Sequence, residues 1–303
     1  MESIWSKRGI KTLVYLALAG YAAGMLAAGP AVSAAVAEGV EICWRVLVPS
    51  LFPFLVFSGT AADCGLLEEL GAGLDRLTTA LYRLPGCCGS IWLMGALGGY
   101  PLGVRATLDL YRAGALGREA AERMLGFCAC CGPGFLLGTV GLSVFGSAKT
   151  GLILLAIHWT GSLLIGFLLT RNLSLQVCNT TNSRSFQDPV SAFTGAVRGA
   201  VGGVGAICGF YLFFRGLMAL LPAGSPGWLL GFLEMSCGVL ALDGPPHSLP
   251  LAAGILGWGG LSVHCQAMDL LQGSGLRVRY YWGGKLLHGL LSWALCRLVL
   301  LFL

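Results

Sequence analysis

The chain alternates between long apolar runs without charge and short clusters of charged residues. No Asp, Glu, Lys or Arg falls within residues 12–37, 124–148 or 150–170. A helix crosses the hydrocarbon core of a bilayer with roughly 20 apolar residues, so each of these runs is long enough to cross. The pattern predicts about eight to ten membrane-embedded helices, some of them of half length.

The amino-acid composition supports the same conclusion. Of 303 residues, 56% are hydrophobic and 11% are charged, and the mean hydropathy is +0.78. Soluble domains carry about 25% charged residues. A chain with so few polar residues requires a lipid bilayer as its partner, and the expected fold class is all-α, a polytopic helix bundle in the cell membrane.

The charges are few and scattered. The net charge is +5, and no basic block alternates with aromatic residues, which argues against nucleic acid as a partner. Lys7, Arg8 and Lys11 place the N-terminus in the cytoplasm by the positive-inside rule. An uncleaved first span is expected, although the small residues at 31–34 also fit a signal-peptide cleavage site.

A polar stretch from Arg171 to Pro189 divides the chain. We therefore expect a membrane half at 1–170, a polar linker at 171–191 and a second membrane half at 192–303. The two halves resemble each other, because five of ten positions are identical between 95–104 and 254–263. Such repeats are a hallmark of transporter folds.

Glycine and proline interrupt the first of these repeated segments. The sequence Gly98–Gly103 contains three glycines and Pro101, which disfavour a helix interior. Backbone groups freed at membrane depth require protein or water-filled surroundings. We predict a re-entrant hairpin or broken helix over Gly86–Ala113, with a counterpart over Ser248–Gly273. The alternative is a kinked span.

Ionisable and polar residues inside apolar runs are the candidate contacts for a bound solute, because their insertion is costly. If the two breaks meet at a pseudo-twofold axis, Arg105 and His264 should line one cavity. The alternatives are a helix-end carboxylate reaching headgroups for Glu234, and interhelical hydrogen bonding for His264 and Gln266. The predicted substrate-binding residues are Tyr100, Arg105, Asp109, Glu234, His264 and Gln266.

The remaining chemistry-bearing residues favour structural roles. His158 fits a satisfied interhelical histidine better than a ligand. The cysteines at 87–88 and 128–131 lack a CxxC spacing and a histidine close in sequence. We expect no metal, no cofactor and no enzymatic activity, since no P-loop, GxSxG or HExxH motif occurs. An intramembrane thiol or metal protein is a third hypothesis.

Six motifs follow one another along the chain: Ser50–Phe54, Pro85–Ser90, Gly98–Gly103, Phe127–Phe135, Gly231–Met235 and Trp258–Gln266. In this order they resemble the YlbJ-type sporulation integral membrane proteins, from about Val46 to the C-terminus. The glycine–tyrosine–proline motif also resembles the nucleoside-recognition Gate domains. Two departures are Ala129–Cys131, where that family usually has an asparagine–serine stretch, and Arg105, where a lysine is common.

The resemblance implies a membrane protein of an endospore-forming bacterium that is needed for the spore cortex. Through the Gate relatives it implies transport. The leading hypothesis is a transporter-like protein that moves or senses a small polar solute between the two breaks. The alternative is a non-transporting membrane scaffold for cortex-building machinery. Further partners expected are sporulation membrane proteins or a second copy of the chain.

Overall fold

The computed structural model describes residues 4–174, 188–242, 244 and 247–302. All regular structure in these ranges is helical, which confirms the predicted all-α fold. Within them, Ala148–Thr170 and Pro189–Met218 are long and apolar enough to cross a membrane. The bent pair Lys11–Ala27 and Gly29–Leu47 adds a third if it forms one span. Many other helices are short because the chain interrupts them.

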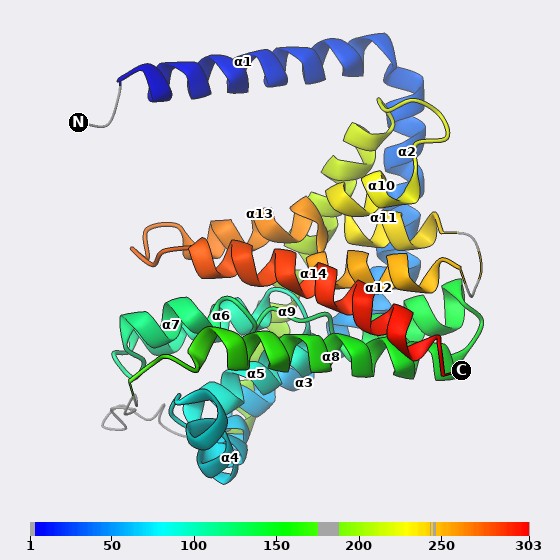
Figure 1. Cartoon of the computed structure of the whole chain (residues 1–303). Helices are drawn as coiled ribbons and strands as arrows, with labels where there is room; N and C mark the ends of the chain where they lie inside the picture. The colour runs from blue at the N-terminus through cyan, green and yellow to red at the C-terminus, as the bar shows by residue number, and fades with distance from the viewer. Residues whose placement is uncertain (1–3, 175–187, 243, 245–246, 303) are drawn as a thin grey trace.

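The N-terminal helix α1 (Ile4–Ala27) extends from the rest as an arm (Figure 1). It meets α2 (Gly29–Ile42) at a bend of 95°. Pro30 lies in the first turn of α2, where its fixed φ and missing N–H favour a helix start. The end of α1 contacts the body of the protein through Tyr21, whose ring centroid is 5.3 Å from that of Phe213.

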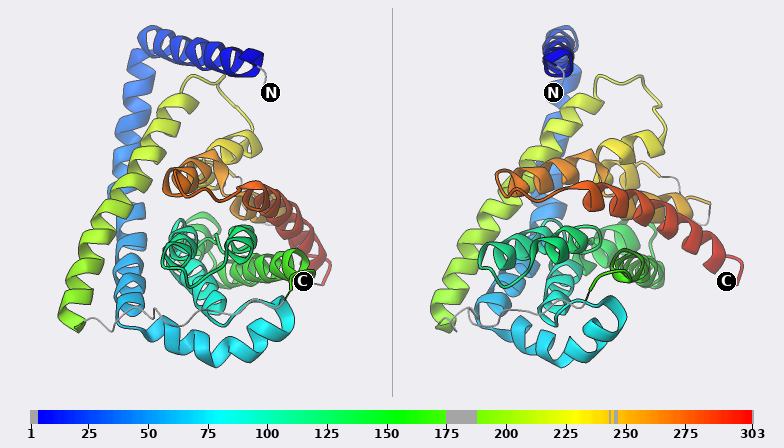
Figure 2. Two further views of the ribbon diagram at one scale, coloured as in Figure 1. Left: turned by 90° about the vertical axis from the view of Figure 1, so that its left-hand side faces the viewer. Right: turned by 60° about the vertical axis from the view of Figure 1, so that its left-hand side comes forward.

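A long pair of helical segments forms one side of the molecule. The chain continues from α2 through the π-helix η1 (Cys43–Leu47) into α3 (Val48–Asp63). Helix α9 (Pro189–Met218) runs beside α2 and α3 (Figure 2). Small residues allow the close approach: a methyl group on Gly59 of α3 would lie 3.0 Å from the Cβ of Ala196.

The remaining long helices lie across this pair in a bundle. Helix α14 (Arg279–Val299) packs antiparallel to α8 (Ala148–Thr170). Helices α12 (Leu249–Trp258) and α13 (Gly260–Leu271) both follow α14, since Gly254 faces Trp293 and His264 contacts Tyr281. Helices α12 and α13 therefore form one interrupted path through the helix bundle along α14, and such a path is called an interrupted crossing of the bundle below. The interruption uses Gly259 and Gly260, whose φ angles of 93° and 80° suit only glycine.

A second interrupted crossing runs beside the first. It consists of α7 (Arg118–Met124) and the π-helix η2 (Gly134–Val144), separated by residues 125–133. The η2 helix returns into α8, and the two touch at Gly141 and Gly151, where an added methyl group would be 2.8 Å from the facing Cα. The contact allows the backbones to approach without intervening side chains.

The segment Gly86–Ala113 folds back on itself. Helices α5 (Cys87–Gly98) and α6 (Leu102–Arg112) face each other at Gly95 and Gly103, where a methyl group on Gly95 would be 3.2 Å from the Gly103 Cα. The amphipathic helix α4 (Leu66–Tyr82) leads into this hairpin.

Both outer ends of this hairpin lie at the same end of the bundle. Arg83, just before α5, donates a hydrogen bond to the carbonyl of Leu173 beyond α8. Arg118, shortly after α6, donates to the carbonyl of Gly275, just before α14. The segment 86–113 thus has the hairpin form of the prediction and its counterpart at 248–273 has the broken-helix form. The position of either segment relative to a membrane stays a prediction.

A second hairpin comes from another part of the chain. Helices α10 (Gly227–Leu233) and α11 (Met235–Leu240) turn at Glu234, and Gly231 and Gly238 bring their backbones together. The order of hairpin, interrupted crossing and continuous helix therefore occurs twice, ending in α8 and in α14. The sequence match aligns α5–α6 with α12–α13, but by form and order α5–α6 corresponds to α10–α11. The division at 171–191 stays a prediction, and residues 175–187 lie outside the described ranges.

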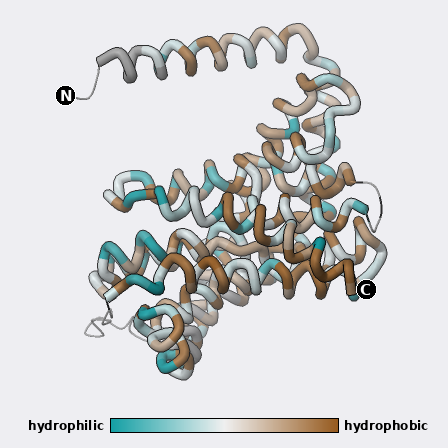
Figure 3. Tube along the Cα trace, in the orientation of Figure 1, coloured by the Kyte–Doolittle hydropathy of each residue, from teal (hydrophilic) through white to brown (hydrophobic). Residues whose placement is uncertain are grey.

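Basic residues gather at one end of the bundle. Arg123 of α7 donates to the carbonyl of Leu169 near the end of α8, and its guanidinium lies 4.5 Å from the ring centroid of Tyr280 near the start of α14. Hydrophilic segments mark this end in Figure 3, on the side of α6 and α7. The basic residues at this end are Arg83, Arg112, Arg118, Arg123, Arg171, Arg277 and Arg279. The opposite ends of α8 and α14 carry Lys149 and Arg297.

Candidate functional site

The turn of each hairpin lies against the break of one interrupted crossing. The turn of the first hairpin lies against residues 125–133, where a methyl group on Gly99 would be 3.1 Å from the nitrogen of Gly132. The turn of the second hairpin lies against the α12–α13 break, where a methyl group on Gly260 would be 2.8 Å from the nitrogen of Met235. Irregular backbone is thereby enclosed in protein, which is the condition for placing it at membrane depth.

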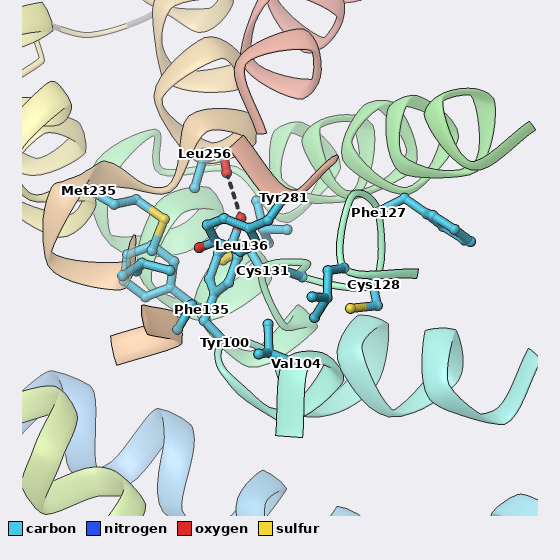
Figure 4. Close-up of a cluster of buried hydrophobic side chains, with 14 of the residues drawn as sticks. Tyr100, Val104, Phe127, Cys128, Cys131, Phe135, Leu136, Met235, Leu256 and Tyr281 are labelled. Atoms are coloured by element: carbon cyan, nitrogen blue, oxygen red, sulfur yellow. Dashed lines mark hydrogen bonds between the residues drawn. The ribbon is translucent and has the colours of Figure 1, made fainter. Parts of the chain in front are cut away.

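Tyr100 joins the two pairs. Its hydroxyl donates a hydrogen bond to the carbonyl oxygen of Leu256, near the end of α12, at 3.2 Å (Figure 4). The two glycine-rich breaks identified in the sequence are therefore in direct contact, although they are separated by more than half of the chain. Their contact creates the central part of the site.

A small cavity of about 40 Å³ lies between the breaks. Apolar walls come from η1, α3 and η2. The polar residues that line it include Tyr100, Glu234, Ser236, Ser262 and Gln266. Three of the six predicted site residues, Tyr100, Glu234 and Gln266, are thus brought together here.

Glu234 has a structural role at this point. It is 4% exposed, and its carboxylate accepts a hydrogen bond of 2.7 Å from the backbone N–H of Cys237. It therefore caps the start of α11, while also forming part of the cavity wall. The side chain of Glu234 is therefore buried and hydrogen-bonded, and it does not extend outward from a helix end as the headgroup alternative requires.

Replacing Glu234 separates the cap from the charge. Glu234→Ala should lower the free energy of unfolding by about 1–3 kcal/mol, because it leaves a buried N–H without an acceptor. Glu234→Gln keeps an acceptor oxygen, so its free energy of unfolding should be close to that of the native protein. Thermal unfolding of the purified variants measures both effects. Equal destabilisation by both substitutions would show that the carboxylate charge, rather than the cap, matters.

A larger cleft of about 600 Å³ lies beside the small cavity, between the α3–α9 pair and helices α6 and α13. Gly195, Gly199, Gly202 and Gly203 of α9 form one wall and keep it open. The polar lining residues are Asp63, Arg105, Asp109, Gln266 and Asp269. The structure thus places Arg105, Asp109 and Gln266 of the predicted site here, and adds Asp63 and Asp269 to them.

Gln266 belongs to both spaces. It lines the small cavity and the cleft and is 6% exposed. Among the described residues, no hydrogen bond involves its side-chain amide. A buried amide that faces two adjoining spaces is suited to contact a polar molecule that moves between them.

His264 lies elsewhere. Its Nδ1 is 2.8 Å from the Tyr281 hydroxyl, and its ring packs between Trp258 and Trp282, with centroids at 4.3 Å and 4.7 Å. It lines neither space. The structure therefore does not bring Arg105 and His264 to one cavity: a half-turn of α13 separates the face that carries Gln266 from the face that carries His264.

Sequence reasoning missed Lys285, although it is the lone charged residue between Arg279 and Arg297. Lys285 is 1% exposed. Its ammonium donates to the Tyr100 hydroxyl at 2.6 Å and to the carbonyl of Ala129 at 3.1 Å. The sequence did contain an indication of this residue, because a cation within the apolar run of α14 is costly to insert and therefore marks a candidate site.

The 128–133 segment bonds to neighbouring helices through backbone groups. Its Ala129 carbonyl accepts from Lys285, and its Cys131 N–H donates to His158 Nε2 at 2.8 Å. The ring of His158 lies 4.3 Å from that of His288, which in turn contacts the His158 carbonyl. His158 thus bonds between segments through Nε2, as interpreted from the sequence, whereas its buried Nδ1 has no hydrogen-bond partner among the described residues.

The cysteines do not assemble into a metal site among the described residues. No group of three or more His, Cys, Asp or Glu side chains is arranged to hold a metal ion in that part of the chain. Cys130 instead contacts the hydroxyl of Ser162 at 3.3 Å, and Ser162 donates to the carbonyl of Phe127. These small side chains tie α8 to the 125–133 segment.

Comparison with known proteins finds one informative likeness. No family model matches the chain, and no solved structure matches it. The sporulation integral membrane protein YlbJ of Bacillus subtilis (strain 168) is 31% identical over 128 residues, which are 42% of this chain. The match covers 31% of YlbJ, less than a third of that protein's length. The chain that contains these cavities is thus similar, over part of its length, to a bacterial sporulation integral membrane protein.

Proposed function

We propose that this chain is a transporter-like integral membrane protein of endospore formation that moves or senses a small polar solute. The cleft between α3–α9 and α6–α13 carries the proposal. It has a volume of about 600 Å³ and is lined by a guanidinium, carboxylates and an amide within a largely apolar bundle. Cavities of roughly 300–1,000 Å³ with a few polar groups are typical of small-molecule sites.

The lining predicts the kind of solute. Arg105 offers a planar donor set for a negatively charged or carbonyl group, whereas Asp109 and Asp269 accept hydrogen bonds or attract a positive group. Gln266 supplies both a donor and an acceptor. A small solute with separate negative and donor groups fits this lining.

The membrane setting and the process rest on different support. The apolar helices favour a position within the bilayer, with the cleft reaching the central helix breaks through Gln266. A role in sporulation is proposed from the likeness to YlbJ. Participation in cortex formation is proposed from the family resemblance described above.

Filling the cleft tests the proposal. Gly199 faces the cleft, and a Cβ at this position would meet no atom within 4 Å. Gly199→Trp therefore starts from open space at Cβ, and its indole should occupy the solute space and abolish uptake of the responsive solute. A screen of polar solutes in vesicles that contain the native protein first identifies that solute.

Gly209→Trp is the matched control. Gly209 is exposed on the same helix, has no atom within 4 Å of its ideal Cβ and does not line the cleft. It should retain native uptake. If Gly199→Trp supports heat-resistant spores as well as Gly209→Trp does, at equal protein abundance, the cleft is not the functional site and the scaffold hypothesis takes its place.

A further inference from the structure

Lys285 has the surroundings of a bound cation rather than those of an ion pair. It is the buried charged side chain of α14, and it forms no salt bridge with a carboxylate among the described residues. Burial of an unpaired ammonium is costly, so the residue requires compensation from neutral groups.

Oxygen atoms and an aromatic face supply that compensation. The Tyr100 hydroxyl donates to Leu256, so its lone pairs are left to accept from the Lys285 ammonium. The carbonyl of Ala129 can act only as an acceptor. The ammonium also lies 4.6 Å from the Tyr100 ring centroid, within the range of a cation–π interaction.

These groups come from helix interruptions. Ala129 follows the helical turns that extend α7, since Cys128 N–H still bonds to Met124. Leu256 lies in the last turn of α12, whose carbonyls carry the negative end of the helix dipole. Carbonyls at unwound backbone and at the C-terminal ends of half-helices are the groups that coordinate small cations in transporters built from interrupted helices.

We infer that the junction of the helix breaks is a monovalent-cation site whose cation is the Lys285 ammonium, carried by the chain itself. The hydroxyl of Tyr100 and the carbonyl of Ala129 are its ligands, and Tyr100 links it to the α12 carbonyl end. A tethered cation holds the first hairpin, the 125–133 segment and α12 together without an ion from solution. Wild-type folding and solute binding are therefore independent of sodium.

Removal of the side chain should convert the tethered site into one that accepts a free cation. Lys285→Ala should lower the Tm of the purified protein. Ethylammonium should restore most of the loss, because it replaces the missing ammonium and part of its stem, whereas choline at the same concentration is too bulky to enter. Lys285→Met fills the space without charge, and it should remain destabilised with no response to ethylammonium.

Lys149→Ala is the control, because Lys149 is exposed at the end of α8 and its loss should leave the Tm unchanged in every salt. Restoration of Lys285→Ala by choline as fully as by ethylammonium would overturn the inference, as would restoration by neither. A Lys285→Met variant as stable as the native protein would do the same. If Lys285→Ala does not fold, the Tm of the wild-type protein is compared in sodium, potassium and choline salts. A higher Tm in sodium would contradict the inference that the Lys285 ammonium occupies the site.

Only the sodium independence of uptake rests on the proposed function. With the solute identified by the vesicle screen, wild-type uptake should be equal in sodium and potassium buffers. Uptake that requires sodium would overturn the inference and leave the transport proposal standing. Absence of uptake in both buffers, together with Tm restoration by ethylammonium, would instead remove the transport proposal and keep the cation site.

Discussion

Gly284→Ala should sharply reduce the amount of folded protein, whereas Gly283→Ala should leave it unchanged. A methyl group on Gly284 of α14 would overlap the carbonyl group of Gly126 and lie 2.7 Å from its Cα. All of these atoms belong to the backbone, so no flexible side chain can yield. Overpacking usually costs about 1–3 kcal/mol, and a contact between two backbones belongs at or above the upper end.

The damage would reach the centre of the site. Gly126 itself belongs to the 125–133 segment, and two residues further on the Cys128 carbonyl is inserted between Gly95 and Gly103 of the first hairpin. A shift of this segment would also displace the Ala129 carbonyl from Lys285. Gly284→Ala should therefore lower both the Tm and the yield of monodisperse protein in detergent.

The neighbouring glycine provides the comparison. Gly283 is exposed, and a Cβ there would meet no atom within 4 Å. Gly283→Ala should raise stability by about 0.5–1 kcal/mol, because alanine favours the helix. Similar yields for the two variants would show that α14 and the 125–133 segment are not packed backbone to backbone.

The second large effect concerns the orientation of the bundle. We expect Gln272→Cys to react with an impermeant maleimide only from the cytoplasmic face, and Lys149→Cys only from the outer face. Both positions are exposed. Gln272 directly follows α13 and lies close to the start of α14, whereas Lys149 lies beside Val299 and Leu300 at the other end of α14. The arginine-rich end carries Gln272, and short basic segments remain in the cytoplasm.

This assignment agrees with the N-terminus. The positive-inside rule predicts a cytoplasmic position for the start of α1, which carries Lys7, Arg8 and Lys11. Figure 1 shows the N-terminal end of α1 on the same side as α7. The C-terminus lies on the other side. The experiment uses whole cells and inverted vesicles in a cysteine-depleted background. Reaction of both positions from one face would reject the crossing of α8 and α14 in opposite directions.

The sequence by itself predicted that the helices are surrounded by lipid, and it predicted where the helices are interrupted. Long uncharged runs identify helices in lipid because a charged group at membrane depth is costly, and that cost is local to each run. In the same way, Gly98–Gly103 predicts a break, because proline lacks a donor and glycine disfavours a helix wherever they occur. Both arguments need only neighbouring residues.

The tertiary structure alone decided what each break does and which side chains meet there. The segments 86–113 and 248–273 look alike in sequence, yet one folds back on itself and the other continues beside α14. Their packing partners differ: the Cys128 carbonyl is inserted between Gly95 and Gly103 in the first, whereas α14 lies along the second.

The same reason explains the site residues. Arg105 and Gln266 reach one cleft, while His264 faces Tyr281 on another side of its helix. Lys285 became visible as part of the site only through Tyr100 and Ala129, which are distant in sequence. Insertion cost marks a polar residue as unusual from the sequence, but the direction of its side chain and the identity of its partner depend on helix packing across the whole bundle.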